Sequence, residues 1–195
     1  MDLPAPAARV SGPRGGGAEG GRELALALAR ARTGDPAACE ALYRDYARAV
    51  HGIALARVGP GEAEDVTQEA FAAVFRGLSA VRDAAALPGW ICAVARNVAE
   101  DARRRRARRP APGPLASEPV APPVRDGEGE LRSRVLRRLE QLPQAYRETL
   151  VLRLVEGLSG PEIAARTGLS PGSVRVNLCR GMALLRPLLQ EEGWP

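Results

Sequence analysis

Lysine is absent from this 195-residue sequence, so all 28 basic side chains are arginines. Aromatic residues contribute only 4% of the chain, and any core must therefore be built from aliphatic side chains and alanine. The formal net charge of +5 favours binding to polyanions, although net charge gives no information about the fold. The positions of the arginines are consequently more informative than their number.

Cysteine and histidine are too scarce and too scattered to suggest a metal centre or a disulfide framework. Cys39, Cys92 and Cys179 stand far apart, with no CxxC spacing and no neighbouring histidine. The only histidine, His51, has no cysteine or carboxylate beside it at ligand spacing, and no nucleophile is paired with a base. The sequence therefore predicts no enzyme activity, no metal and no cofactor.

Long apolar runs are also absent, and no segment has the length and hydrophobicity of a membrane span. The N-terminal residues 1–21 are rich in proline, glycine and alanine and lack the apolar centre of a signal peptide. We therefore expect a cytoplasmic protein without membrane insertion, in which residues 1–21 form a disordered N-terminal tail.

A helical period of apolar residues runs through most of the chain, and no alternating strand pattern interrupts it. Asp35 and Pro36, for example, are typical of an N-cap and a first helical residue. Residues 110–129 contain six prolines and few large apolar residues, which is typical of a linker. We predict an all-α fold of two small helical domains, residues 22–109 and 130–192, joined by a Pro/Gly-rich linker over residues 110–129.

The stretch LSGPEIAARTGLSPGSVRVNLCRGMALLRPLL has the parts of a helix-turn-helix. Ser159 and Glu162 form a capping box at the start of a short helix, and Gly168 suits the tight turn that follows it. Ser170 and Pro171 then begin a longer second helix. The combination favours DNA binding over an ordinary helical hairpin with a solvated face.

On that second helix, the apolar period places four residues on the inner face: Val174, Leu178, Gly181 and Leu185. The residues left outside would face base edges if the helix lies in the major groove of DNA. They are Arg175, Val176, Cys179 and Arg180.

Six arginines crowd into residues 103–109, just before the proline-rich linker. Arginine also suits the negative end of a helix dipole, so the run is consistent with a plain helix end as well as with phosphate contacts. We predict that Arg103, Arg104, Arg105 and Arg106 hold the DNA backbone, and we leave Arg108 and Arg109, next to the linker, out of this set.

Three stretches together resemble the conserved regions of bacterial RNA polymerase sigma factors, and the two-domain layout is similar to the small extracytoplasmic-function (ECF) type of the sigma-70 family. They are DVTQEAFAAVFRGL, WICAVARNVAEDARRR and the segment from LPQAYRETL to GMALLR. The resemblance implies that the first domain is region 2, a helical bundle that binds the β′ clamp helices and opens the minus-ten element. The second would be region 4, which binds the β flap and reads the minus-thirty-five element.

The resemblance also implies roles for particular residues. The family pattern D-x-x-Q-E-x-F assigns core-polymerase binding to Asp65, Gln68, Glu69 and Phe71, with Phe75 one turn further on. Arg96 and Asn97 match the minus-ten helix of the family, and residues 79–89 match the loop that captures a flipped base. In the second domain the DNA-facing set extends to Ser173 and Asn177; Asn177 and Cys179 stand where the family often has arginine and histidine.

The implied activity is that of an alternative sigma factor, which binds core RNA polymerase and promoter DNA and directs promoter-specific initiation. An anti-sigma factor is the further partner that the family implies. Promoter elements two helical turns apart are separated by ~70 Å, and a linker of about twenty residues lets two domains reach that far. The alternative is a stand-alone helix-turn-helix regulator that never binds polymerase, and the residues that distinguish the two are Asp65–Phe71.

Overall fold

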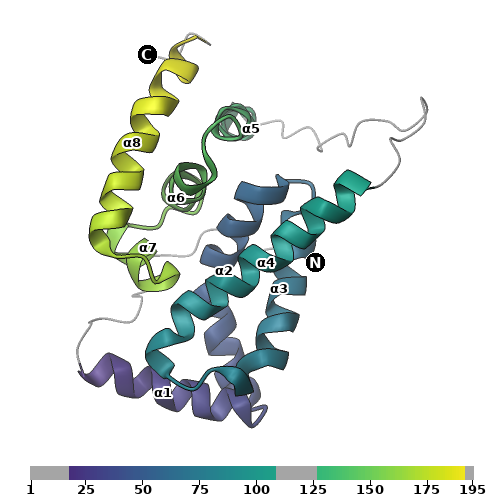
Figure 1. Cartoon of the computed structure of the whole chain (residues 1–195), viewed down its shortest axis with the longest axis vertical. Coiled ribbons are helices and arrows are strands. Elements are labelled where there is room, and N and C mark those ends of the chain that lie inside the picture. Colours follow the sequence, from purple (N-terminus) through teal and green to yellow (C-terminus); the bar gives the residue numbers. More distant parts are fainter. Residues whose placement is uncertain (1–17, 109–126, 192–195) are drawn as a thin grey trace.

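Eight α-helices make up the part of the chain that the computed structural model describes, residues 18–108 and 127–191 (Figure 1). No strand occurs within these two ranges, and the all-α prediction is confirmed. Most of the expected tail and linker lies outside the described residues. At their edges, a helix begins at Ala18 rather than at Arg22, and another begins at Gly127 rather than at Glu130.

The first domain is a bundle whose core is aliphatic and alanine-rich. Leu42, Tyr46, Val50 and Ile53 recur at helical spacing, and all four are buried along the second helix. Asp35 caps that helix as predicted, because its carboxylate accepts a hydrogen bond from the Ala37 amide at 2.9 Å. The four helices are α1 (Ala18–Arg32), α2 (Pro36–Val58), α3 (Ala63–Gly77) and α4 (Leu87–Arg108).

The second domain contains the helix-turn-helix, and its local signals behave as the sequence predicts. Ser159 and Glu162 form both bonds of the capping box, at 3.3 Å and 2.7 Å. Gly168 has φ of 72°, in the left-handed region that favours glycine, and Ser170 caps the second helix of the motif. The helices are α5 (Gly127–Leu139), α6 (Gln144–Leu154), α7 (Gly160–Thr167) and α8 (Pro171–Gln190).

The two domains are docked on each other. Helix α6 packs on α2 and α7 packs on α4, so that α6 and α7 lie between α8 and the first domain (Figure 1). Apolar side chains of both domains share clusters; Ala49 of α2, for example, packs with Leu152, Ile163 and Val174. Gly52 of α2 permits this close approach, since a Cβ there would lie 2.6 Å from Leu152 Cδ2.

Among the helices of residues 18–108 and 127–191, none has both the length and the apolar character that a membrane span requires.

Candidate nucleic-acid interface

The exposed face of α3 carries three of the five residues predicted to contact polymerase. Asp65, Gln68 and Glu69 are all exposed. Phe71 is instead only 4% exposed and belongs to the core of the first domain, where it packs on Tyr43 with ring centroids 4.5 Å apart. Phe75 is half-buried, with its ring 5.9 Å from that of Phe71. The aromatic pair therefore supports the helix from beneath, while the polar residues form its accessible surface.

Helix α4 brings Arg96 and Asn97 to different surroundings. Asn97 is exposed, whereas Arg96 is half-buried between the two domains. The Arg96 guanidinium donates from both Nε and Nη2 to the carboxylate of Glu148 on α6, at distances of 2.7–3.2 Å. Burial alone would lower the pKa of Arg96, but the hydrogen bonds and charge of Glu148 outweigh burial and raise it. Arg96 is thus firmly charged and already paired.

The arginine run at the end of α4 is solvent-exposed and forms ion pairs on two helices. Arg103 and Arg104 both bind Glu100, at 2.7 and 3.2 Å. The pKa of the Glu100 carboxyl is lowered to about 2, chiefly by the hydrogen bond from Arg103. Arg105 reaches across to Glu69 of α3 at 2.8 Å. The predicted phosphate-contact run and the predicted polymerase-contact helix are therefore neighbouring surfaces.

Arg106 completes this set of contacts, with its Nη1 atom 3.6 Å from the Glu62 carboxylate. Exposed pairs of this kind contribute little to stability, because water and salt screen them. The pairing therefore leaves open the prediction that the run contacts phosphate.

The recognition helix α8 presents most of its predicted DNA-facing residues to solvent. Arg175, Val176, Cys179 and Arg180 are exposed, and the inner set of Val174, Leu178, Gly181 and Leu185 is buried or half-buried as predicted. Ser173 is exposed as well, but its hydroxyl lies 2.8 Å from that of the cap residue Ser170.

The side chain of Asn177 points toward α6, unlike those of its exposed neighbours on α8. Its side-chain amide donates to the hydroxyl of Thr149 on α6 at 3.3 Å, and the residue is half-buried. Asn177 therefore ties the recognition helix to the rest of the second domain. For Asn177 to contact DNA as predicted, its hydrogen bond to Thr149 would have to break.

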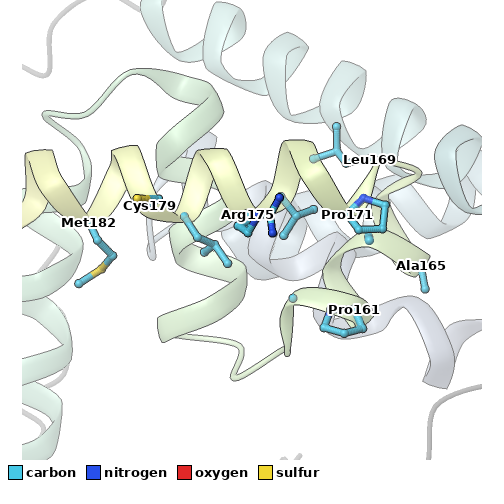
Figure 2. A pocket seen from close by; sticks show the side chains of 11 residues that line it. Pro161, Ala165, Leu169, Pro171, Arg175, Cys179 and Met182 are labelled. Carbon is cyan, nitrogen blue, oxygen red and sulfur yellow. The ribbon is translucent and has the colours of Figure 1, made fainter.

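An apolar groove of about 880 Å³ runs between α7 and α8 (Figure 2). Pro161 and Ala165 line it from α7, and Arg175, Cys179 and Met182 line it from α8 (Figure 2). Two of the predicted DNA-facing residues thus stand at the edge of an apolar surface.

Sequence reasoning missed the residues that join the two domains. Glu148 is only 7% exposed, and it also binds Arg57 of α2 at 3.0 Å. His51, for which the sequence predicts no metal-binding or catalytic role, lies 2.7 Å from the carboxylate of Glu156. A usable signal existed for Glu148: it lies one turn before the buried Leu152, on the apolar face of a short helix.

Cys92, for which the sequence suggests neither a metal nor a disulfide, is buried in the first domain and contacts the second. Its Sγ atom lies 3.1 Å from the carbonyl oxygen of Arg166 on α7. Burial raises the pKa of the Cys92 thiol to about 12, so the group stays neutral.

Comparison with known protein families identifies both domains. Residues 42–109 match sigma-70 region 2, and residues 132–185 match sigma-70 region 4. The chain belongs to the ECF-type RNA polymerase sigma factors. It is an alternative sigma factor, as its sequence predicts; the presence of region 2 disfavours the stand-alone regulator, which would need only the helix-turn-helix.

Two named relatives are similar in sequence to this sigma factor over most of their own length. RNA polymerase sigma factor CarQ of Myxococcus xanthus is 35% identical over 169 residues, which cover 84% of this chain and 96% of CarQ. The ECF RNA polymerase sigma-E factor of Escherichia coli K12 is 31% identical, covering 77% of this chain and 86% of that protein. A solved structure of CnrH, in complex with the cytosolic domain of CnrY, matches with a TM-score of 0.59 and 25% identity over 85% of this chain and 96% of CnrH.

Proposed function

We propose that this sigma factor binds core RNA polymerase through the exposed face of α3 and directs initiation by reading two promoter elements. The observation that carries the proposal is the position of Asp65, Gln68 and Glu69, which are exposed together on a helix supported by the buried Phe71. Gln68 and Glu69 have no capping role in α3: Gln68 donates to Glu64 one turn earlier at 3.3 Å, and Glu69 pairs with Arg105 of α4. Their exposure favours a partner contact, whereas Asp65 also suits the helix dipole as a first-turn carboxylate. The partner would be the β′ clamp helices, with the β flap binding the second domain.

DNA recognition would be divided between the two domains. In the first, Asn97, Arg96 and residues 79–89 would read and open the minus-ten element, while Arg103–Arg106 hold its backbone. In the second, the exposed arginines of α8 would read the minus-thirty-five element in the major groove. The chain would contribute recognition and DNA opening, and the polymerase would supply the chemistry in the cytoplasm.

A protein inhibitor is the remaining partner that we propose. CnrH, which shares the fold over most of its length, is complexed with the cytosolic domain of a second protein, CnrY. An anti-sigma factor that binds this chain would be the corresponding partner here.

The test is co-purification of the tagged chain with core polymerase. The wild-type chain is expected to retain core enzyme. Gln68→Ala is expected to weaken retention because it removes an exposed amide, at the cost within α3 of a surface hydrogen bond to Glu64. Glu40→Gln, at an exposed position of α2 paired only with Arg44, is the matched control. A chain that binds operator-like DNA well but never retains core enzyme would contradict the proposal and favour a stand-alone regulator.

A further inference from the structure

Val176 is an exposed apolar residue in the middle of the outward face of α8. It stands two residues after the buried Val174, and therefore on the opposite side of the helix. Of this residue 44% is exposed, and the three apolar clusters of the described residues do not include it. A single exposed apolar residue is common on proteins, so the neighbours of Val176 must show what it contacts.

Arg180 lies one turn beyond Val176 on the same side of α8, and it is exposed as well. Arg175 and Cys179 line the apolar groove between α7 and α8 (Figure 2), whereas Val176 and Arg180 do not. Val176 and Arg180 therefore form a separate pair, an apolar side chain and a cation, that no other part of the second domain uses as groove lining.

The surface above Val176 is open to a close approach. Gly172 precedes Val176 by one turn, and a Cβ added there would meet only Ser170 Oγ, at 3.9 Å. A valine side chain is short and its χ1 angle is nearly fixed in a helix, so a partner must come close to α8 to contact it. Gly172 leaves the space that such an approach requires.

The charges of α8 favour DNA as that partner. The helix, Pro171–Gln190, carries three arginines and no aspartate or glutamate. No carboxylate of α8 would therefore repel phosphates, and DNA offers both phosphates and guanine edges to the arginines.

The chemistry of a valine then selects one base. In the major groove only thymine presents an apolar group, its C5 methyl. Cytosine and adenine present amino groups there, and an amino group placed against valine methyls would lose its hydrogen bond to water without gaining another. Val176 therefore favours thymine over the other bases.

We infer that Val176 determines specificity within the upstream promoter element by reading the C5 methyl group of a thymine, while Arg180 binds a guanine nearby. The inference rests on the proposed role of α8 in reading the minus-thirty-five element. Val176 and Arg180 are four residues apart, which is about 6 Å along the helix axis. Because base pairs are ~3.4 Å apart, the thymine and the guanine lie within about three base pairs of each other.

The first experiment compares base preferences. Core polymerase is combined with the wild-type chain or with Val176→Ala, and each holoenzyme selects fragments from a promoter library in which the minus-thirty-five element is randomised. The wild type is expected to enrich thymine over cytosine at one position by about threefold or more. Val176→Ala should lose this enrichment and keep the guanine, and alanine is the better helix former, so the variant folds. Leu184→Ala, at a residue 45% exposed two turns further along α8, is the matched control and should keep both preferences.

The second experiment removes the methyl group alone. The enriched thymidine is replaced by deoxyuridine in a fluorescein-labelled fragment, and the affinity of each holoenzyme is measured by fluorescence anisotropy. The wild type is expected to bind the uracil fragment about two- to fourfold more weakly, which is the effect of one buried methyl group. Val176→Ala should bind the two fragments equally.

Three results would overturn the inference while leaving the proposed function intact. They are no thymine enrichment by the wild type, an equal loss on uracil in both proteins, and a Val176→Ala variant that binds every library sequence more weakly by the same factor. The last result would assign Val176 to a protein or sugar–phosphate contact. Failure of the wild-type chain to retain core polymerase would instead overturn the proposed function, and this inference with it.

Discussion

Arg96 and Arg180 are both arginines with a predicted DNA contact, but their surroundings give them different availability. Arg180 is exposed on α8 beside the exposed Arg175. Arg96 is half-buried and held by Glu148. The apolar period of α8 predicts the Arg180 contact and the family resemblance predicts the Arg96 contact. Only the folded chain shows that Arg96 must first exchange a partner. Residue-scale predictions are therefore sharpest on α8.

Replacing Arg180 by alanine should weaken binding at the minus-thirty-five element by about 1–3 kcal/mol, the usual value of a bidentate arginine–guanine contact. The measurement is the affinity of holoenzyme for promoters with an intact or a scrambled upstream element. Arg186→Ala, also exposed on α8 but further from its start, removes the same charge and should change both affinities little. An equal loss on intact and scrambled promoters would instead indicate a phosphate contact.

At the scale of the element, the helix-turn-helix depends on its caps. The Ser159 hydroxyl accepts from the Glu162 amide, and the Glu162 carboxylate accepts from the Ser159 amide at 2.7 Å. These bonds satisfy amides that a helix start would otherwise leave unpaired. A helix of only eight residues has few other hydrogen bonds, so α7 should be sensitive to the loss of either partner.

Ser159→Ala should lower the free energy of unfolding by about 1 kcal/mol, because an N-cap hydroxyl is lost. Urea denaturation followed by circular dichroism measures the change. Ser79→Ala, at an exposed serine that caps no helix, is the control and should leave stability nearly unchanged. Similar values for the two variants would show that the capping box contributes no stability.

The same box predicts a dependence on pH. Hydrogen bonds from Ser159 lower the pKa of the Glu162 carboxyl below its ordinary value of 4.5. A carboxyl whose pKa falls on folding stabilises the fold above its unfolded pKa, and this contribution is lost as pH falls through the folded pKa. The stability advantage of wild type over Glu162→Gln should therefore be larger at about pH 7 than at about pH 3. An advantage that is the same at both pH values, or larger in acid, would contradict the assignment.

The arginine-rich end of α4 gives a prediction about salt. If Arg103–Arg106 hold the DNA backbone, neutralising all four to glutamine should reduce the slope of log affinity against log salt by up to about 3–4 units. Promoter binding measured across a salt series checks this. Arg44→Gln, in an exposed pair on α2, should leave the slope unchanged. If the salt dependence of promoter binding were unchanged in the variant with all four arginines replaced, Arg103–Arg106 would be only a solvated helix end.

The sequence predicts these elements well because their signals are local. Asp35, Ser159 and Ser170 cap helices where expected, and Gly168 supplies the left-handed turn. The resemblance to the sigma family, in contrast, placed Phe71 and Asn177 in partner-facing sets, although Phe71 is in the core and Asn177 bonds Thr149. A family pattern identifies which positions matter but does not distinguish a contacting residue from one that supports it.

At the scale of the whole molecule, the sequence predicts two domains but not their docking. The docking surface of α2 is built from Ala49, Gly52 and Ala56, small residues that give no strong signal in an apolar period. Glu148 and its arginine partners are 52 and 91 residues apart in the chain. Pairing over such distances depends on how two finished surfaces fit, and no local pattern in either domain encodes it.

The measurement that tests the central claim most directly is run-off transcription with purified core polymerase over a library of genomic fragments. Addition of the chain should produce discrete transcripts from a limited set of fragments, and their upstream regions should share two elements about two helical turns apart. Core enzyme alone is the control and should give none of these transcripts. A transcript pattern that does not change when the chain is added, under conditions where a known sigma factor supports initiation, would contradict the claim that this protein directs promoter-specific transcription.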